Sequence, residues 1–168
     1  MGFFSRLFHN KKQEDEIEER TVLNLQVGDI VTYNLEDYQV VGKLHYNDSG
    51  YTWDAYQLQG EGKIKWLSVE MDDELEIGMY ERANLQLDQP IPESVAYKDR
   101  QYHLSEQGTA FVKGEGRSQN VHGKDMEYYD FEDNSEEHFL SVEIWGSEVE
   151  VSYGYAIEEY EIKILAGS

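Results

Sequence analysis

The residues of this chain best suited to acid–base chemistry are two glutamates that end the same short motif. Leu67-Ser68-Val69-Glu70 recurs 73 residues later as Leu140-Ser141-Val142-Glu143. Two carboxylates that meet could act as an acid and a base. Each glutamate continues a strand-like alternation, however, and we expect both to point outward beside Val69 and Val142. The serines lie outside any Gly-x-Ser-x-Gly elbow, so we predict no catalytic residue and no enzymatic activity.

The five histidines and the oxygen-rich loops give little support to metal chemistry. No histidine belongs to a His-x-x-x-His or His-Glu-x-x-His pattern, and the chain has no cysteine. Glu136-Glu137-His138 could supply ligands from one strand face, but such clusters in an acidic chain are usually solvated turns. The loops Asn47 to Gly50 and Asp130 to Glu137 lack the twelve-residue calcium pattern. We therefore predict no metal site and no cofactor.

The first twelve residues have the composition of a contact segment. Four are bulky and apolar, three are Lys or Arg, and none is acidic: Phe3, Phe4, Leu7, Phe8, Arg6, Lys11 and Lys12. On a helix the apolar four fall within one arc of about 140°. We predict a short N-terminal amphipathic helix that contacts a membrane surface or a membrane-protein partner weakly and reversibly. The alternative is an unstructured start whose phenylalanines are incidental.

The rest of the chain must position its side chains on β-strands. From Leu25 onward, runs rich in Val, Ile, Tyr and Trp are cut by turn residues about every 8–12 residues, which is typical of an all-β barrel or sandwich. We predict four parts: an amphipathic leader and charged spacer (1–20), a first β-unit (21–84), a connector (85–92) and a second β-unit (93–168). Each β-unit has a marginal core by itself, so the two are expected to pack together.

The two halves resemble each other in order and spacing. Trp66 falls on Phe139 at a shift of 73, whereas Tyr38 falls on Tyr102 at a shift of 64. The difference of nine residues fits the polar stretch Gly114 to Gly123, which we predict to be a longer loop between strands. The predicted fold class is therefore all-β, with two tandem similar antiparallel β-units of small barrel or sandwich type.

The first half also resembles a known family. The matching residues are Val27-Gly28-Asp29, Tyr33, Tyr38, Val40-Val41-Gly42, Tyr51, Trp53-Asp54, Tyr56 and the run from Trp66 to Glu70. They are similar to the bacterial family filed as domain of unknown function 4178, which has no established catalytic residue. Its members are often encoded beside small membrane proteins, phage-shock-type membrane-stress proteins and polyamine synthase-like enzymes. The resemblance implies an accessory role near the envelope.

Charge narrows the choice of partner. The chain of 168 residues has 35 acidic and 14 basic side chains and a formal charge of -21. Such a surface repels phosphate backbones, so nucleic acid is not expected as a partner. We predict a non-enzymatic accessory or adaptor protein of the bacterial cytoplasm that acts peripherally at the inner face of the membrane or with a membrane-protein partner. The alternative is a ligand-binding protein or enzyme with an acidic cleft between the two units for a cationic small molecule such as a polyamine.

Overall fold

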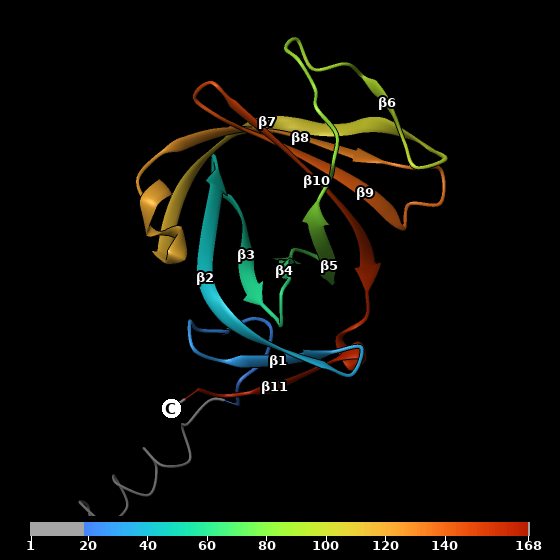
Figure 1. Cartoon of the computed structure of the whole chain (residues 1–168). Helices are drawn as coiled ribbons and strands as arrows, with labels where there is room; N and C mark the ends of the chain where they lie inside the picture. The colour runs from blue at the N-terminus through green and yellow to red at the C-terminus, as the bar shows by residue number, and fades with distance from the viewer. Residues whose placement is uncertain (1–18, 168) are drawn as a thin grey trace, which may run out of the picture.

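A computed structural model describes residues 19–167 of the chain (Figure 1). The predicted N-terminal helix and all seven of its contact residues lie outside the described residues. No helix within residues 19–167 is long and apolar enough to cross a membrane.

The described part of the chain is built almost entirely from antiparallel strands, which confirms the all-β prediction. The elements are β1 (Ile30–Tyr33), β2 (Glu36–Asp48), β3 (Tyr51–Gln59), β4 (Ile64–Met71), β5 (Leu75–Arg82), β6 (Ser94–Tyr97), β7 (Arg100–Gly116), β8 (Asp125–Glu132), β9 (His138–Trp145), β10 (Glu148–Ile157) and β11 (Ile162–Leu165), with short 3-10 helices η1 (Arg117–Val121) and η2 (Glu159–Glu161).

Eight of the strands close into one barrel. The sheet runs in the order β11-β1-β2-β3-β4-β5-β10-β9-β8-β7-β6, and a further pairing of β2 with β7 joins its two arms. The closed wall therefore takes β2 to β5 from the first half of the chain and β7 to β10 from the second. Neither half closes by itself, and the predicted division into two tandem units stays a prediction.

The two longest strands each change face part-way along. A β-bulge lies between Val40 and Gly42 in β2, and another lies between Leu104 and Glu106 in β7. An extra residue reverses the alternation. Consequently the first part of each strand presents its apolar side chains to the outside of the barrel, and the second part presents them to the inside.

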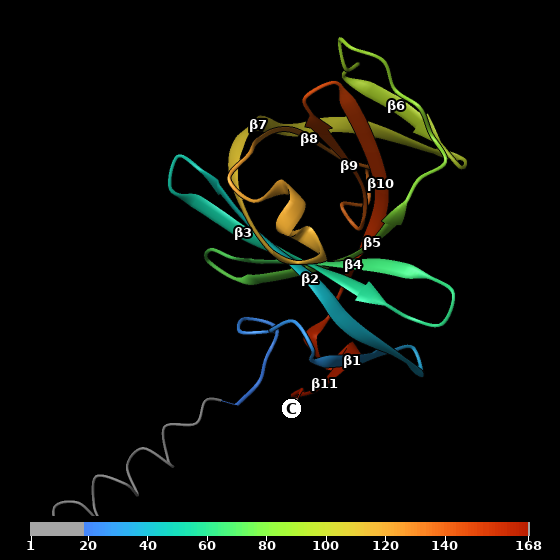
Figure 2. The same cartoon turned by 60° about the vertical axis from the view of Figure 1, so that its left-hand side comes forward.

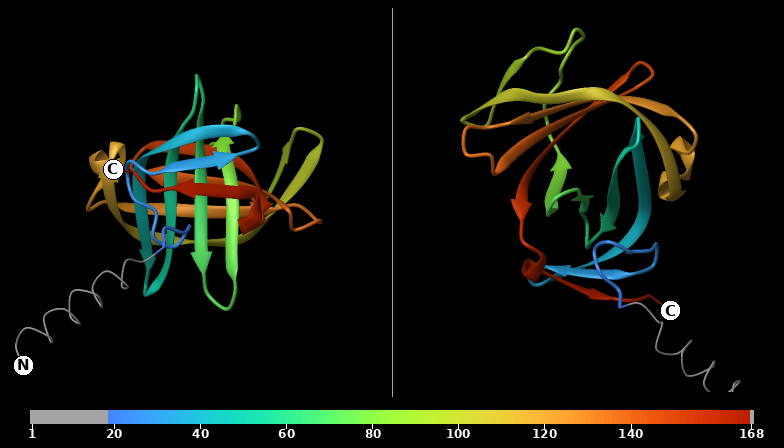
Figure 3. Two further views of the ribbon diagram at one scale, coloured as in Figure 1. Left: turned by 90° about the horizontal axis from the view of Figure 1, so that it is seen from below. Right: turned by 180° about the vertical axis from the view of Figure 1, so that it is seen from behind.

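The outer face of the barrel is covered on two sides, and the main apolar cores lie under these covers. β1 and β11 cross over β3, β4 and β5 (Figure 3), where Leu58, Leu67 and Met79 are completely buried. The connector after β5 and strand β6 cover β8, β9 and β10, above Leu140 and Val142. On β4, β9 and β10 the apolar side of the wall therefore faces outward and the polar side faces the interior, whereas a third apolar cluster, with Leu44, Val112 and Met126, lies inside the barrel.

Candidate functional site

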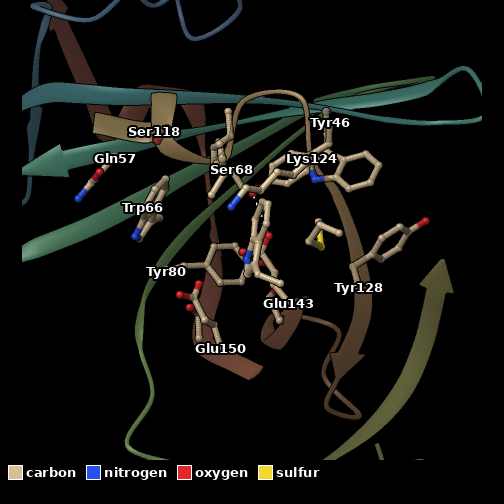
Figure 4. A pocket seen from close by; sticks show the side chains of 18 of the residues that line it. Tyr46, Gln57, Trp66, Ser68, Tyr80, Ser118, Lys124, Tyr128, Glu143 and Glu150 are labelled. Atoms are coloured by element: carbon tan, nitrogen blue, oxygen red, sulfur yellow. Dashed lines mark hydrogen bonds between the residues drawn. The ribbon is translucent and has the colours of Figure 1, made fainter. Parts of the chain in front are cut away.

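The interior of the barrel contains a cavity of about 1100 Å³ (Figure 4). All eight strands of the wall and the segment between β7 and β8 contribute side chains to its lining. The three tryptophans of the chain, Trp53, Trp66 and Trp145, all lie in this lining. A cavity of this size accommodates a small organic molecule.

Alternation on β4 and β9 brings carboxylates into the cavity. Leu67 and Leu140 are buried under the outer covers, so Glu70 and Glu143 point inward and line the cavity. The expectation that these glutamates point outward to solvent was wrong. Its error lay in assuming that the apolar side of the sheet faces the inside of the barrel, whereas here β1, β11 and β6 cover that side.

The strand register places carboxylates directly opposite one another on the inner face. Glu70 pairs with Glu76 across β4 and β5, and Glu143 pairs with Glu150 across β9 and β10. Across β7 and β8, Glu106 lies opposite Asp130. Like charges directly opposite each other in a sheet are destabilising. The register therefore builds electrostatic repulsion into the wall at three places.

One of these pairs has a basic partner. Arg82 Nη1 lies 3.3 Å from Glu150 Oε1, at a solvent-exposed position. Arg117 and Lys124 also border the cavity, but neither forms an ion pair with another described residue. Negative charge thus remains largely uncompensated inside the barrel.

Three of the interior carboxyls have pKa values raised to about 7, so that each is partly protonated at neutral pH. Burial, with the nearby carboxylates Glu76, Glu106 and Asp72, raises the pKa of Glu70 to about 7. Burial also raises the pKa of Asp130 to about 7, assisted by Glu106, Glu143 and Glu70.

Glu143 is the third of these carboxyls, and it also accepts a hydrogen bond from Tyr46. Burial raises the pKa of Glu143 to about 7, and the negative charge of Glu150 adds to this rise. The hydrogen bond from Tyr46 and the positive charge of Arg82 both act to lower the pKa. The Tyr46 hydroxyl donates this hydrogen bond to Glu143 Oε2 over 2.9 Å. Tyr46 thereby links the carboxylates to the aromatic part of the lining.

Aromatic rings form the neighbouring part of the lining. Tyr46 stacks on Trp53 with ring centroids 5.0 Å apart, and Trp53 meets Tyr128 edge to face at 5.1 Å. Tyr128 is fixed by donating a hydrogen bond from its hydroxyl to Asp48 Oδ2 over 2.5 Å. Ring faces attract organic cations, and carboxylates do so more strongly. The lining combines both types of group.

The segment predicted as a longer loop forms one wall of the cavity. Within Gly114 to Gly123, η1 lies across an opening of the barrel (Figure 2), and its Ser118 is only 4% exposed. Gly42 and Gly114 allow this approach, because a Cβ at either position would collide with Ser118. Arg117 donates a hydrogen bond from Nη1 to Gln59 Oε1 over 2.8 Å and ties the segment to β3.

Comparison with known proteins gives a family for the chain. The family model described as "Domain of unknown function (DUF4178)" matches residues 26–159. The chain belongs to the DUF4178 family. The match confirms the resemblance found in the sequence, and it spans every strand of the barrel. A search of curated proteins and a search of solved structures gave no match.

Of the oxygen-rich stretches considered as calcium loops in this DUF4178 protein, only Asp130 lines the cavity, and it belongs to strand β8. In the other stretch, Asn47 and Asp48 end β2, and Ser49 and Gly50 form the turn before β3, where Asn47 Oδ1 accepts a hydrogen bond from the Gly50 amide. Glu136 and Glu137 belong to the turn before β9, and His138 opens that strand. No group of three or more potential metal ligands converges within residues 19–167.

Sequence reasoning missed most of the cavity. It singled out Glu70 and Glu143 because their motif recurs, and it considered Asp130 only as part of a calcium loop. It did not single out Glu106 or Glu150. The signal that could have found Glu150 is the alternation of glutamates with valines from Glu148 to Val151 on β10. The valines pack in an outer core, which leaves the two glutamates for the interior.

Proposed function

We propose that this DUF4178 protein binds a cationic organic molecule inside its barrel, as a binding protein and not as an enzyme. The observation that supports this function best is the opposition of carboxylates on the inner face of a cavity that also presents aromatic rings. A ligand with positive charge offsets the repulsion between these carboxylates, and its carbon skeleton packs against the rings.

The chemistry of the lining favours an organic cation over a metal ion. The carboxylates are spread over several strands and do not converge into a group of metal ligands within the described residues. A molecule with separated positive groups can reach several of them at once.

A calorimetric titration with spermidine at about 150 mM salt tests the proposal. We expect saturable heat with a defined stoichiometry, and quenching or a spectral shift of the tryptophan emission, because all three tryptophans line the cavity. Glu143→Gln should weaken binding by about tenfold, since it removes a charged hydrogen-bonding partner. Glu127→Gln, on the outer face of β8, is the matched control and should bind like the wild type.

Two results would count against an interior binding site. Heat that disappears as salt is added means diffuse counterion attraction to an acidic surface. Equal weakening by Glu143→Gln and Glu127→Gln means that the cation is held outside the barrel.

The repeat of the Leu-Ser-Val-Glu motif indicates how positive charge would be arranged in a ligand of this cavity. We propose, as the sequence predicts, that the barrel combines two similar units, and this is supported by the two bulges, which lie 64 residues apart like Tyr38 and Tyr102. Glu70 and Glu143 are then equivalent positions on opposite halves. Such an arrangement favours a ligand with a positive group near each end.

A second function is favoured by the composition of the leader. We propose that Phe3, Phe4, Leu7 and Phe8 attach the protein weakly to the inner face of the membrane or to a membrane-protein partner, where it acts as an adaptor in the cytoplasm. Burial of apolar side chains supplies the attraction. Arg6, Lys11 and Lys12 add roughly 1 kcal/mol each beside anionic lipid.

Co-sedimentation with liposomes that contain anionic lipid tests the attachment. We expect part of the wild-type protein to pellet at low salt and the Phe4→Glu/Phe8→Glu variant to stay in the supernatant. Leu35→Glu is the control, because Leu35 is fully exposed on the body of the protein. If the wild type also stays in the supernatant, lipid is excluded and a protein groove is the remaining partner.

A further inference from the structure

We infer that the barrel exchanges protons for its cation, so that binding releases protons to solvent and tightens as the pH rises through neutrality. This inference rests on the proposed function, because it concerns the same cavity. It adds that the protein responds to pH as well as to the concentration of its ligand.

The arrangement of carboxyl groups in the barrel wall allows protons to be exchanged for a cation. Glu70, Asp130 and Glu143 belong to the three cross-strand pairs in which one carboxylate lies directly opposite another. All three line the cavity and none forms an ion pair with a described basic residue. When the cavity is empty, a proton on one member of each pair is the simplest way to relieve the repulsion.

The groups around Glu70 and Asp130 are almost all acidic. Glu70 is faced by Glu76 from β5, by Glu106 from β7 and by Asp72 from the turn after β4. Asp130 is faced by Glu106, Glu143 and Glu70. Tyr80 and Tyr128 also line this part of the cavity, and burial raises the pKa of each phenol above its usual value, so both stay neutral. The surroundings of these two carboxyls therefore favour protonation.

Glu143 has a mixed environment. Tyr46 donates a hydrogen bond to it, Glu150 lies opposite it, and Arg82 contributes a weaker positive field. Arg117 and Lys124 reach the cavity from the segment between β7 and β8 and carry the remaining positive charge of the lining. With a pKa of about 7 for each of the three carboxyls, the empty cavity holds roughly one to two exchangeable protons at neutral pH.

A cation placed among these carboxyls shifts their equilibrium from the protonated form to the ionised form. Positive charge within a few ångströms favours the ionised form of each carboxyl, so bound protons leave as the ligand enters. By linkage, each proton released steepens the pH dependence of the affinity by up to tenfold per pH unit. With about one proton released, Kd should fall by roughly five- to tenfold between pH 6.5 and 7.5 and level off above pH 8.

Hexamethonium is a suitable probe, because its two trimethylammonium groups keep their charge at every pH. The full-length protein is titrated calorimetrically at pH 7.0 in phosphate and in HEPES, whose ionisation enthalpies differ, at equal ionic strength. The difference between the observed heats gives the number of protons released. A second series in one buffer between pH 6 and 8.5 gives the change in Kd.

Matched variants assign the protons to the cavity. Asp130→Asn should reduce the number of protons released and flatten the pH dependence of Kd, whereas Glu127→Gln, on the outer face of the same strand, should leave both unchanged. Binding with about one proton released, diminished in Asp130→Asn, supports the inference. Saturable binding with no proton release and a constant Kd overturns it and leaves the proposed function standing. If neither hexamethonium nor spermidine gives saturable heat, the proposed function fails, and the inference fails with it.

Discussion

Leu67 and Ser68 are neighbours in β4, yet the wall of the barrel separates them. Leu67 is completely buried in the outer core, and Ser68 lines the cavity. Leu140 and Ser141 repeat this arrangement on β9, where Leu140 is 1% exposed. Consequently the stability of the fold and the chemistry of the interior depend on alternate residues of the same strands.

Substitution of these residues should separate the two roles. Leu67→Ala and Leu140→Ala should each lower the free energy of unfolding by roughly 2–5 kcal/mol, because each leaves a cavity in a packed core. Ser68→Ala and Ser141→Ala should change it little, because neither serine packs in an outer core. Urea denaturation curves measure both effects. If the serine substitutions lower the free energy of unfolding and the leucine substitutions do not, the serines pack in the outer core and the leucines face the cavity.

At the scale of the elements, periodicity predicts the strands well. Two of the runs that turn residues separate, Tyr51 to Gln59 and Leu75 to Glu81, coincide with β3 and β5 within one residue at each end. Strand-forming residues and the turn residues between them can be recognised in short stretches of sequence, so the strands can be predicted without knowledge of the fold. The long loop expected at Gly114 to Gly123 is found from Arg117 onward, because Gly114 to Gly116 still belong to β7, and its 3-10 helix and its place across the opening were not foreseen.

The bulges explain why the interior was not predicted. In β2, Tyr38, Val40, Leu44 and Tyr46 are all buried and are separated by two or four residues, so alternation counts them on one face. The bulge between Val40 and Gly42 instead divides them between the outer core and the inside of the barrel. Because both faces are buried, the apolar pattern has no break that reveals the change. In β7, by contrast, the bulge follows Leu104 and coincides with three polar, exposed residues, Ser105 to Gln107.

At the scale of the whole molecule, closure of the barrel was beyond sequence reasoning. It depends on the pairing of β5 with β10 and of β2 with β7, strands that lie about 70 residues apart in the chain. Pairings between strands so distant in sequence leave no local pattern. They also decide which carboxylates meet, so the candidate site could not be assembled before the topology was known.

The carboxyls inside the barrel should also set the pH dependence of stability. The pKa values of Asp130 and Glu143 in the folded protein are raised from 3.8 and 4.5 to about 7. Between about pH 4.5 and 7 the folded state therefore binds protons that the unfolded chain gives up. Stability must fall as the pH rises through this interval and level off near pH 8.

Thermal melting without ligand at pH 5.5 and pH 8 measures this effect. We expect the free energy of unfolding to be about 2–4 kcal/mol lower at pH 8 than at pH 5.5. For a chain of this size this difference corresponds to a Tm that is roughly 5–15 °C lower at pH 8. Asp133, held by Arg100 over 2.8 Å, has a lowered pKa and remains ionised at both pH values, so it does not mask the trend. The Asp130→Asn/Glu143→Gln variant should melt higher than the wild type at pH 8 and show a flatter profile. A wild-type Tm that is constant or rises from pH 5.5 to 8 would mean that these carboxyls are ionised without penalty, and the interior could not then retain protons at neutral pH.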